Sequence, residues 1–336
     1  MSSLRVSVVI TAYNRRNFIY EAIQSLVQQT LNLSMFEVII ISNFNIDTNI
    51  FPKSLEMRLF IRDGIVGEFL YEGIKNSKNE IIAFLDDDDT FDPRKLETLI
   101  EVFSKNPSII YYHNGMKYIN TKSEYIQRVR LTESWAQLSK KGHLIFDLTD
   151  NLSYYKEAIR LRGDFNLSSI AVKREYAEKY LSLLRKIEGL SDGFFFWISL
   201  AFQGRLMIDT KYLTNYRIHD SNTSGNLDIK KKINDLHTQT QTFDMILDFI
   251  NSTYSMNPTY TFFIEWVHLL RCEYALIKYI FEGASKVMIV KLLIRIFLIN
   301  PRISNTLKYR IIGFASLNLI SKRIANRLYL KFRAMS

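Results

Sequence analysis

Four consecutive aspartates, Asp86–Asp89, directly follow the apolar run Ile81–Leu85. Open α/β sheets bind their ligands beyond the carboxyl ends of the strands, and carboxylates packed together there raise each other's pKa. A divalent cation relieves this repulsion, and carboxylate oxygens suit Mg²⁺ or Mn²⁺. Asp86 and Asp88 stand two residues apart where a strand turns into a loop, so their side chains can converge. The run predicts a metal site; the alternative is a solvated acidic turn in which an aspartate caps the next helix.

The elements that would position these residues can be read from the hydrophobic spacing of residues 1–110, where apolar runs of strand length alternate with helical patterns. Strands are expected at Val6–Ile10, Phe36–Ile41, Met57–Ile61, Ile81–Leu85 and Ile109–Tyr112. Helices are expected at Asn17–Gln29, at Glu68–Asn76 and from a cap at Asp92-Pro93 through Phe103. Such alternation is typical of an α/β fold with a parallel sheet.

The pattern changes further along the chain. Residues 117–163 are less regular. After them we expect a strand at Leu167–Val172, helices at Arg174–Leu184 and Asp192–Phe202, and short strands at Arg205–Asp209 and Tyr212–Ile218. From Ile229 onward the spacing is helical to the last residues. The sequence therefore predicts an α/β domain at residues 1–228 and a helical region at residues 229–336.

Four segments resemble motifs of the inverting glycosyltransferases of family 2, which have the GT-A fold, a Rossmann-like fold for nucleotide-diphospho-sugar transfer. The first segment, Val6–Arg15, is similar to the opening strand and nucleotide-binding loop. Gly73-Ile74 with Asn79-Glu80 is similar to the helix before the next strand, and Ile81–Asp89 with Pro93 is similar to the metal-binding D-x-D element. The last segment, Tyr216–Ser224, is similar to the motif that often closes the catalytic domain. They occur in the family's order and spacing, and the resemblance covers roughly residues 4–225.

The resemblance implies that a sugar moves from a nucleotide diphosphate to an acceptor hydroxyl, with Mn²⁺ or Mg²⁺ neutralising the leaving diphosphate. It assigns the metal to Asp86 and Asp88, and makes Asp89 a further ligand or a contact to the sugar. His219 lies where a histidine of related enzymes reaches the metal or the diphosphate, and a neutral imidazole is a competent ligand. The alternative is a surface histidine in a polar loop. Arg217 would contact phosphate or pair with a nearby carboxylate.

Inverting transfer is a single in-line displacement, so a base must take the acceptor's proton on the face opposite the leaving group. The family places a carboxylate for this purpose at the N-terminus of a helix in the second half of the domain, and Asp192 fits that position. The alternative role of Asp192 is a helix cap, since aspartate favours such positions. Glu188 is the reserve candidate for the base.

The same resemblance implies the donor-binding residues. Thr11, Tyr13 and Arg15 are similar to the loop that holds the base and the ribose, and Asp86 and Asp87 would face the diphosphate side of the donor.

Two departures from the family pattern concern the same donor site. After the second strand the family usually carries one or two aspartates that read the base, whereas this chain has Ser42-Asn43. Asn43 can still donate to and accept from a uracil edge, which favours a UDP-sugar. The usual Arg-Asn pair before Gly73 is replaced by Leu70-Tyr71, so a common positive contact on the nucleotide side is missing.

The charge of the chain is unevenly distributed. The 336 residues carry 44 Lys+Arg and 34 Asp+Glu, a formal net charge of +10. Residues 283–336 hold eleven of the basic residues and no acidic ones, so the first 282 residues carry 33 basic and 34 acidic side chains, a net of −1. With 47% apolar residues, 5 Pro and 12 Gly, the composition excludes disorder and a collagen-like fibre, and one cysteine excludes a disulfide scaffold. The whole excess charge needs a separate explanation.

The basic C-terminal stretch is also apolar. Lys291 and Arg295 stand four residues apart in a segment that is otherwise aliphatic, and later basic residues are interleaved with Ile324, Leu328 and similar residues. An apolar face edged by cations suits a helix in the headgroup layer of an anionic membrane. The alternatives are a helical bundle packed on the catalytic domain and an interface in a homo-oligomer. Nucleic-acid binding is not expected, because no binding motif accompanies the cations.

Localisation is expected to be cytoplasmic, at the inner face of the membrane. Met1–Arg5 lacks the features of a secretory signal, and the lone Cys272 fits a reducing compartment. We therefore expect a metal-dependent glycosyltransferase of the EC 2.4 class that extends a glycan, with a lipid-linked acceptor, in bacterial O-antigen or capsule synthesis. The competing hypothesis is a non-catalytic relative that binds sugar nucleotides or scaffolds a membrane-associated assembly complex.

Overall fold

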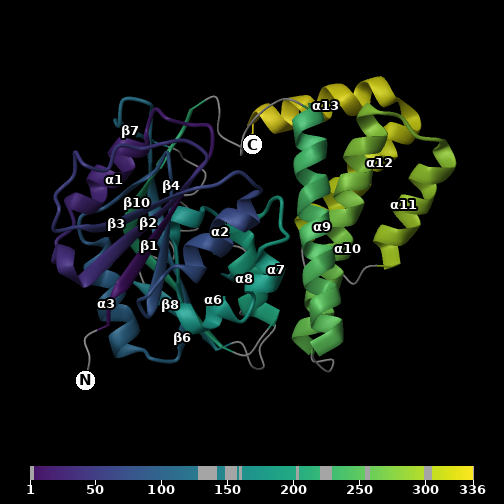
Figure 1. Ribbon diagram of the computed structural model, residues 1–336. Helices are drawn as coiled ribbons and strands as arrows, with labels where there is room; N and C mark the ends of the chain where they lie inside the picture. Colours follow the sequence, from purple (N-terminus) through teal and green to yellow (C-terminus); the bar gives the residue numbers. More distant parts are fainter. Residues whose placement is uncertain are drawn as a thin grey trace. The chain divides into compact units, whose positions relative to one another are not determined.

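A computed structural model of the chain describes residues 4–127, 142–147, 157–158, 161–201, 204–219, 229–253, 258–298 and 305–335. The chain divides into two compact units, Met1–His219 and Asp220–Ser336 (Figure 1). Asp220–Ser224 of the closing motif, Phe202 at the end of a predicted helix, and most of the irregular stretch 128–160 lie outside the described residues. The domain boundary expected at residue 228 also falls there and stays a prediction.

The first unit is built on one ten-stranded sheet with the strand order β3-β2-β1-β4-β9-β6-β10-β5, in which β7 pairs with β6 and β8 with β10. Its strands are β1 Val6–Ala12, β2 Phe36–Ser42, β3 Glu56–Ile61, β4 Ile81–Asp86, β5 Thr90–Phe91, β6 Ile109–Ile119, β7 Tyr125–Ile126, β8 His143–Asp147, β9 Ile170–Lys173 and β10 Arg205–Arg217. Its helices are α1 Ile19–Val27, α2 Val66–Lys75, α3 Lys95–Lys105, α6 Arg174–Glu178, α7 Leu181–Leu184 and α8 Ser191–Ala201.

The strands β3, β2, β1 and β4 form the predicted parallel part of the sheet. Val6 pairs with Phe36 on one side and with Ile81 on the other, so these three strands start and end together. Their carboxyl ends therefore open at the same edge, where Ala12, Ser42 and Asp86 end their strands. The α/β fold class is confirmed, and the aspartates sit where such sheets bind ligands.

The other half of the sheet is mixed, which strand–helix alternation did not predict. Strand β9 runs antiparallel to both β4 and β6, whereas β6 and β10 are parallel. Strands β6 and β10 therefore point the same way as β4. The two short strands expected between Arg205 and Ile218 form one long strand, β10, because a register shift between Asp209 and Tyr212 absorbs the irregularity without ending the pairing to β6.

Two helix predictions need correction. The helix expected at Arg174–Leu184 is broken into α6 and α7 at Tyr180, whose backbone leaves helical geometry while its ring is buried against Tyr176. Helix α3 begins at Lys95, and the preceding residue, Arg94, makes no side-chain capping hydrogen bond, whereas a cap at Asp92-Pro93 was expected. Asp92 Oδ1 instead accepts a hydrogen bond from the Arg94 N–H at 3.1 Å, one turn before the helix.

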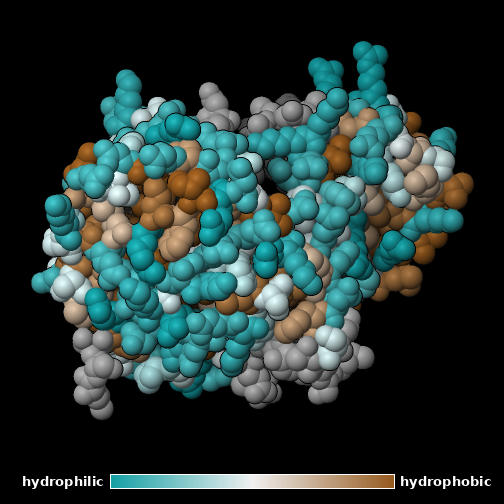
Figure 2. Space-filling model, viewed as in Figure 1, coloured by the Kyte–Doolittle hydropathy of each residue, from teal (hydrophilic) through white to brown (hydrophobic). Residues whose placement is uncertain are grey.

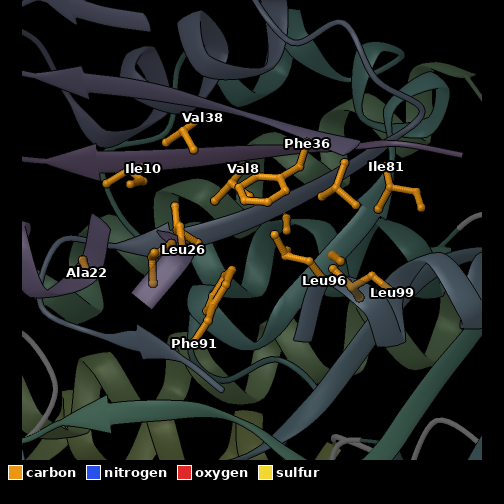
Figure 3. Packing of buried hydrophobic residues seen from close by; sticks show 14 of the residues in the cluster. Val8, Ile10, Ala22, Leu26, Phe36, Val38, Ile81, Phe91, Leu96 and Leu99 are labelled. Carbon is orange, nitrogen blue, oxygen red and sulfur yellow. The ribbon is translucent and has the colours of Figure 1, made fainter. Parts of the chain in front are cut away.

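Alternate residues of the buried strands face different helices. One face carries Val8, Ile10 and Val38, which pack with Leu26 of α1 and Leu96 of α3 (Figure 3).

The opposite face of the sheet is covered by α2. Ile39 and Ile41 pack against Phe69 there, and Gly73 of α2 lies directly over Val9 of β1. Strands covered on both faces need continuous apolar runs, which is why the sequence showed such runs at β1, β2 and β4.

The second unit is helical, with α9 Ile229–Thr253, α10 Pro258–Phe281, α11 Lys286–Leu298, α12 Asn305–Ile320 and α13 Lys322–Met335. Its core includes Ile277 and Ile280 of α10, Ile289 of α11, Ile311 of α12 and Ala325 of α13. Within the ranges that the structure describes, no helix is both long enough and apolar enough to cross a membrane.

The close contact of α2 with β1 predicts a stability effect at Gly73. A Cβ atom there would lie 2.3 Å from Val9 Cγ1, and a β-branched side chain in a buried strand has no room to move. We expect Gly73→Ala to lower the free energy of unfolding by about 1–3 kcal/mol, measured by urea denaturation followed by circular dichroism. The control is Gly313→Ala in α12, where a Cβ would meet no heavy atom within 4 Å. This second change should stabilise its helix by about 0.5–1 kcal/mol, and equal effects at both sites would contradict the packing argument.

Candidate active site

The candidate site forms where four strands end at one edge of the sheet. Asp86–Asp89 follow β4, Tyr13–Arg15 follow β1, and Asn43 follows β2. Because β10 points the same way as β4, its last residue Arg217 and the following His219 reach that edge as well. The topology thus brings residues more than 200 positions apart to the same place.

The aspartate cluster is largely buried. Asp87, Asp88 and Asp89 are 1%, 4% and 0% exposed, and Asp86 is half-buried. One carboxylate oxygen from each of Asp86, Asp88 and Asp89 lies within 4.8 Å of the others. This geometry does not fit the alternative of a solvated acidic turn.

Burial and mutual repulsion disfavour the charged form of these carboxylates. Burial raises the pKa of Asp86 well above its usual range, and the charges of Asp89 and Asp88 add to the rise. Burial raises the pKa of Asp87 to about 7, against the opposing charge of Arg15, and that of Asp89 to about 7. A cation among the carboxylates would offset both effects.

The donor set fits the divalent metal that the sequence implied. Asp86, Asp88 and Asp89 supply three oxygen ligands, the type that Mg²⁺ and Mn²⁺ prefer. His219 Nε2 lies 3.0 Å from Asp88 Oδ2, with its ring packed beside Phe18 at 5.3 Å between centroids. An imidazole at this distance can orient the carboxylate or join it as a ligand.

Arg15 supplies positive charge to the cluster from the loop after β1. Its guanidinium pairs with Asp87 and also contacts Asp88 Oδ2 at 2.6 Å. The N–H of Tyr13 donates to Asp87 Oδ2 at 3.3 Å. The loop after β1 is therefore tied to the loop after β4 through Asp87, and the Asp88 oxygen that faces His219 is shared with Arg15.

Arg217 follows the second of its two predicted alternatives, because it pairs with a carboxylate. Its guanidinium is fully buried, and one amino group donates to Glu21 Oε2 at 2.7 Å. Its Nε donates to the main-chain oxygen of Asp88 at 2.8 Å, and its own N–H donates to Asp89 Oδ1 at 2.9 Å. The face of the guanidinium lies 4.4 Å from the centre of the Phe18 ring. Arg217 thus holds the loop Asp86–Asp89 in place through its hydrogen bonds to Asp88 and Asp89.

The predicted base, Asp192, lies in the first turn of α8 and is joined to the cluster by Asn166. Asp192 Oδ2 accepts from the Asn166 N–H at 3.2 Å, and Asp192 Oδ1 accepts from the Gly193 N–H at 2.9 Å. Burial raises the pKa of Asp192 to about 6; the Asp164 carboxylate adds to the rise, and the two N–H donors oppose it. A carboxylate with such a pKa is suited to accept a proton near neutral pH.

The remaining predicted donor-binding residues lie in β1 and in the loops after β1 and β2. Thr11 pairs with Ile41 on one side and Asp86 on the other in the sheet. Asn43 exchanges two hydrogen bonds with Asn14, at 2.9 and 2.7 Å, and so holds the loop that carries Tyr13.

Tyr13 itself is half exposed. The residue is 52% exposed, and its ring packs edge-on against Phe69 at 5.8 Å between centroids. The reserve base Glu188 is exposed.

Sequence reasoning missed three residues that the structure places at the site: Glu21, Asn166 and Ser168. Glu21 pairs with Arg217, and Ser168 Oγ accepts from the Asp86 N–H at 2.9 Å. Asn166 has φ of 70° and contacts both Asp89 and Asp192. The one available signal was the residue type of Asn166, since asparagine tolerates the left-handed region.

Comparison with known proteins shows what parts of the chain are similar to. Residues 64–163, which include the aspartate cluster, match the family model described as "Glycosyl transferase family 2". An uncharacterized glycosyltransferase of Haemophilus influenzae is 23% identical over 319 residues, which cover 90% of this chain and 98% of that protein. Another, from Rickettsia felis, is 36% identical over 131 residues, or 37% of this chain. The chain spans 21% of the length of that Rickettsia protein.

Solved structures show the same fold. The crystal structure of S. aureus TarS 1-349 in complex with UDP-GlcNAc has a TM-score of 0.61 at 13% identity, covering 98% of this chain and 92% of that one. The mannosyltransferase PcManGT from Pyrobaculum calidifontis, in complex with GDP-Man and Mn²⁺, has a TM-score of 0.53 at 15% identity, covering 99% and 86%. The predicted GT-A-type fold is confirmed. Together with the family match over residues 64–163, the relatives support the predicted resemblance to family 2 and the predicted glycosyltransferase class.

The carboxylate geometry predicts how metal binding responds to single changes. Asp88→Asn removes one negative charge from the cluster and is expected to weaken Mn²⁺ binding about tenfold or more. Free Mn²⁺ would be measured by electron paramagnetic resonance in the presence of UDP. Asp92→Asn is the matched control, because Asp92 lies outside the cluster and an amide oxygen can still accept from the Arg94 N–H. Unchanged binding in Asp88→Asn would refute the assigned metal site.

Proposed function

We propose that this chain is a metal-dependent, inverting glycosyltransferase that moves a sugar from a nucleotide diphosphate, with UDP as the expected nucleotide, to a hydroxyl of a glycan acceptor. The observation that carries the proposal is a cluster of three carboxylates that one residue links to a fourth, separate carboxylate. Asp86, Asp88 and Asp89 converge within 4.8 Å, and Asn166 links Asp89 to a separate carboxylate, Asp192. Inverting transfer needs one group at the leaving diphosphate and a base on the other side.

The aspartate cluster would hold the diphosphate end of the donor. A bound Mn²⁺ or Mg²⁺ would supply positive charge to the leaving diphosphate. Asp86, Asp88 and Asp89 are its proposed ligands, with His219 against Asp88. Arg15 adds a second cation that is already within reach of the cluster.

The nucleotide would lie over the loops after β1 and β2. The half-exposed Tyr13 is proposed to contact the base, and Asn43 has an amide that can exchange hydrogen bonds with a uracil edge once its contact with Asn14 adjusts. Thr11 stands between the two loops and Asp86. Uridine is the proposed base because the Asn43 amide offers both a donor and an acceptor to a uracil edge.

Asp192 is the proposed base. Its carboxylate takes the proton of the acceptor hydroxyl as the acceptor oxygen attacks the anomeric carbon and the bond to the diphosphate breaks. The N–H groups of Asn166 and Gly193 hold the two carboxylate oxygens, so the side chain is oriented before the acceptor arrives. Its position in the first turn of α8 also stabilises the negative charge.

The acceptor is proposed to be lipid-linked, which fits the surface of the second unit. Helix α11 buries Ile289, Leu292 and Ile296 yet also exposes large apolar residues on its outer side. Phe297 and Leu298 are 68% and 82% exposed. Figure 2 shows hydrophobic residues gathered over the part of the surface that α11 forms.

Basic residues accompany this apolar surface. Lys291 and Arg295 are exposed on α11, and Arg323 and Arg327 are exposed on α13 beside the exposed Leu328. Such a face suits the headgroup layer of an anionic membrane, where each basic residue contributes about 1 kcal/mol. A bacterial surface glycan such as O-antigen or capsule would be assembled at such a membrane face. The competing role, a non-catalytic sugar-nucleotide-binding scaffold, would use the same surface without turnover.

Replacement of the proposed base should abolish transfer without loss of donor binding. Asp192→Asn is expected to lower kcat about a hundred- to ten-thousand-fold, measured as release of UDP from a panel of UDP-sugars with Mn²⁺. Glu188→Gln should retain most of the activity, because Glu188 is exposed. The reverse pattern would assign the base to Glu188, and absence of turnover in the wild type with every donor would favour the scaffold.

The pKa of the base predicts a pH profile. Because Asp192 must be ionised to accept a proton and burial raises its pKa to about 6, kcat/KM should fall as the pH drops below about 6. The slope should approach a tenfold loss for each pH unit, about 1.4 kcal/mol. The pH dependence of initial rates measures it, with Mn²⁺ kept saturating at each pH. A profile without an acid limb would contradict this assignment.

Membrane docking predicts a charge-dependent partition. Lys291→Glu combined with Arg295→Glu in the full chain should weaken binding to vesicles of phosphatidylglycerol and phosphatidylethanolamine by about tenfold or more, since two cations are replaced by anions. Co-sedimentation measures the bound fraction. Lys230→Glu combined with Lys231→Glu on α9 changes the net charge by the same amount, is the matched control and should have a smaller effect. Equal binding of the double variant and the wild type would refute docking through α11.

A further inference from the structure

Asn166 connects the two ends of the proposed active site. Its side-chain Nδ2 donates to Asp89 Oδ2 at 2.9 Å, and its main-chain N–H donates to Asp192 Oδ2 at 3.2 Å. Its backbone φ of 70° lies in the left-handed region, which asparagine and glycine tolerate better than other residues. One residue thus contacts a carboxylate of the metal cluster and the proposed base through different groups.

The amide oxygen of Asn166 accepts no hydrogen bond from the described residues. The residue is 4% exposed, and its Oδ1 is buried with no hydrogen-bond partner among the described residues. The amide orientation is set by Asp89, because turning the oxygen toward that carboxylate would place two acceptors together. A buried acceptor without a partner is costly, so it is expected to meet a donor when the site is filled.

We propose that Asn166 Oδ1 accepts a hydrogen bond from a hydroxyl group of the donor sugar and so makes Asn166 a specificity-determining residue. The proposal rests on the proposed function, because it takes the diphosphate to lie at Asp86–Asp89 and the base to be Asp192. In-line displacement requires the transferred sugar to lie between the leaving diphosphate and the base. Asn166 spans that interval through its two hydrogen bonds, so a sugar that fills the interval is the part of the donor expected to bring a hydroxyl to its unpaired oxygen.

The local backbone suits this role. A residue with positive φ and a short amide side chain can place a donor on Asp89 and an acceptor toward the sugar at the same time. A site that hydrogen-bonds a substrate hydroxyl discriminates strongly against donors that lack it, because the buried acceptor would then stay unpaired. Asn166 should therefore select among donor sugars while leaving recognition of the nucleotide unchanged.

Two substitutions separate the functions of the side chain. Asn166→Gly tolerates the positive φ and keeps the main-chain N–H to Asp192, but removes both amide groups. Asn166→Asp keeps an acceptor oxygen and a similar shape, but replaces the donor to Asp89 with a carboxylate that repels it. The first variant tests the sugar contact, and the second tests the contact with the metal cluster.

The experiment compares affinities for UDP and for a UDP-sugar, by isothermal titration calorimetry with saturating Mn²⁺. The sugar nucleotide is the one that the wild type binds most tightly among UDP-glucose, UDP-galactose and UDP-N-acetylglucosamine. For Asn166→Gly we expect the UDP-sugar affinity to fall about tenfold relative to the affinity for UDP. For Asn166→Asp we expect both affinities to fall together. Circular dichroism and the thermal midpoint confirm that the variants are folded.

Asn14→Gly is the matched control. Asn14 also has a positive φ, of 58°, but its side chain pairs with Asn43 on the nucleotide side. Its removal should weaken UDP and the UDP-sugar equally. An unchanged affinity ratio in Asn166→Gly would overturn the assigned sugar contact while leaving the proposed function intact. A wild-type protein that binds UDP and none of the three UDP-sugars would overturn the proposed function, and with it this contact.

Discussion

Electrostatic repulsion among Asp86–Asp89 is the constraint to which the rest of the first unit responds. Burying several carboxylates at one strand end is unfavourable unless each has a partner. The protein supplies them from three places in the fold: Arg15 from the loop after β1, His219 and the main chain of Arg217 from the end of β10, and Asn166 from the segment before β9. Each partner satisfies part of the cluster, and a metal ion would complete the compensation.

The sheet topology makes these partners available. An uninterrupted parallel sheet would need a long crossover connection for every added strand. Here β9 lies between β4 and β6 and runs antiparallel to both, so β6 and β10 run in the direction of β4. Arg217 and His219 therefore arrive at the carboxyl end of β4 although more than 120 residues separate them from Asp88. The mixed half of the sheet thus brings Arg217 and His219 to the aspartates that follow the parallel strand β4.

Much of this was predictable because it depends on local patterns. The continuous apolar runs at β1, β2 and β4 predicted buried strands, and the aspartates directly after β4 predicted a cation site. The burial of Arg217, the link through Asn166 and the direction of β9 depend on contacts distant in sequence, for which one sequence holds no local signal. The helix break at Tyr180 has the same origin, because burial of its ring overrides helical spacing.

The separation of charge along the chain follows from the range of electrostatic forces. At physiological ionic strength exposed charges are screened beyond about 8 Å. Within the described residues, the groups seen to compensate the aspartate cluster belong to the unit that carries it. Arg15 contacts the side chains of Asp87 and Asp88, whereas Arg217 contacts the main chain of Asp88 and the side chain of Asp89. The excess positive charge of the second unit lies among exposed aliphatic residues, and an anionic membrane is the proposed partner of this surface.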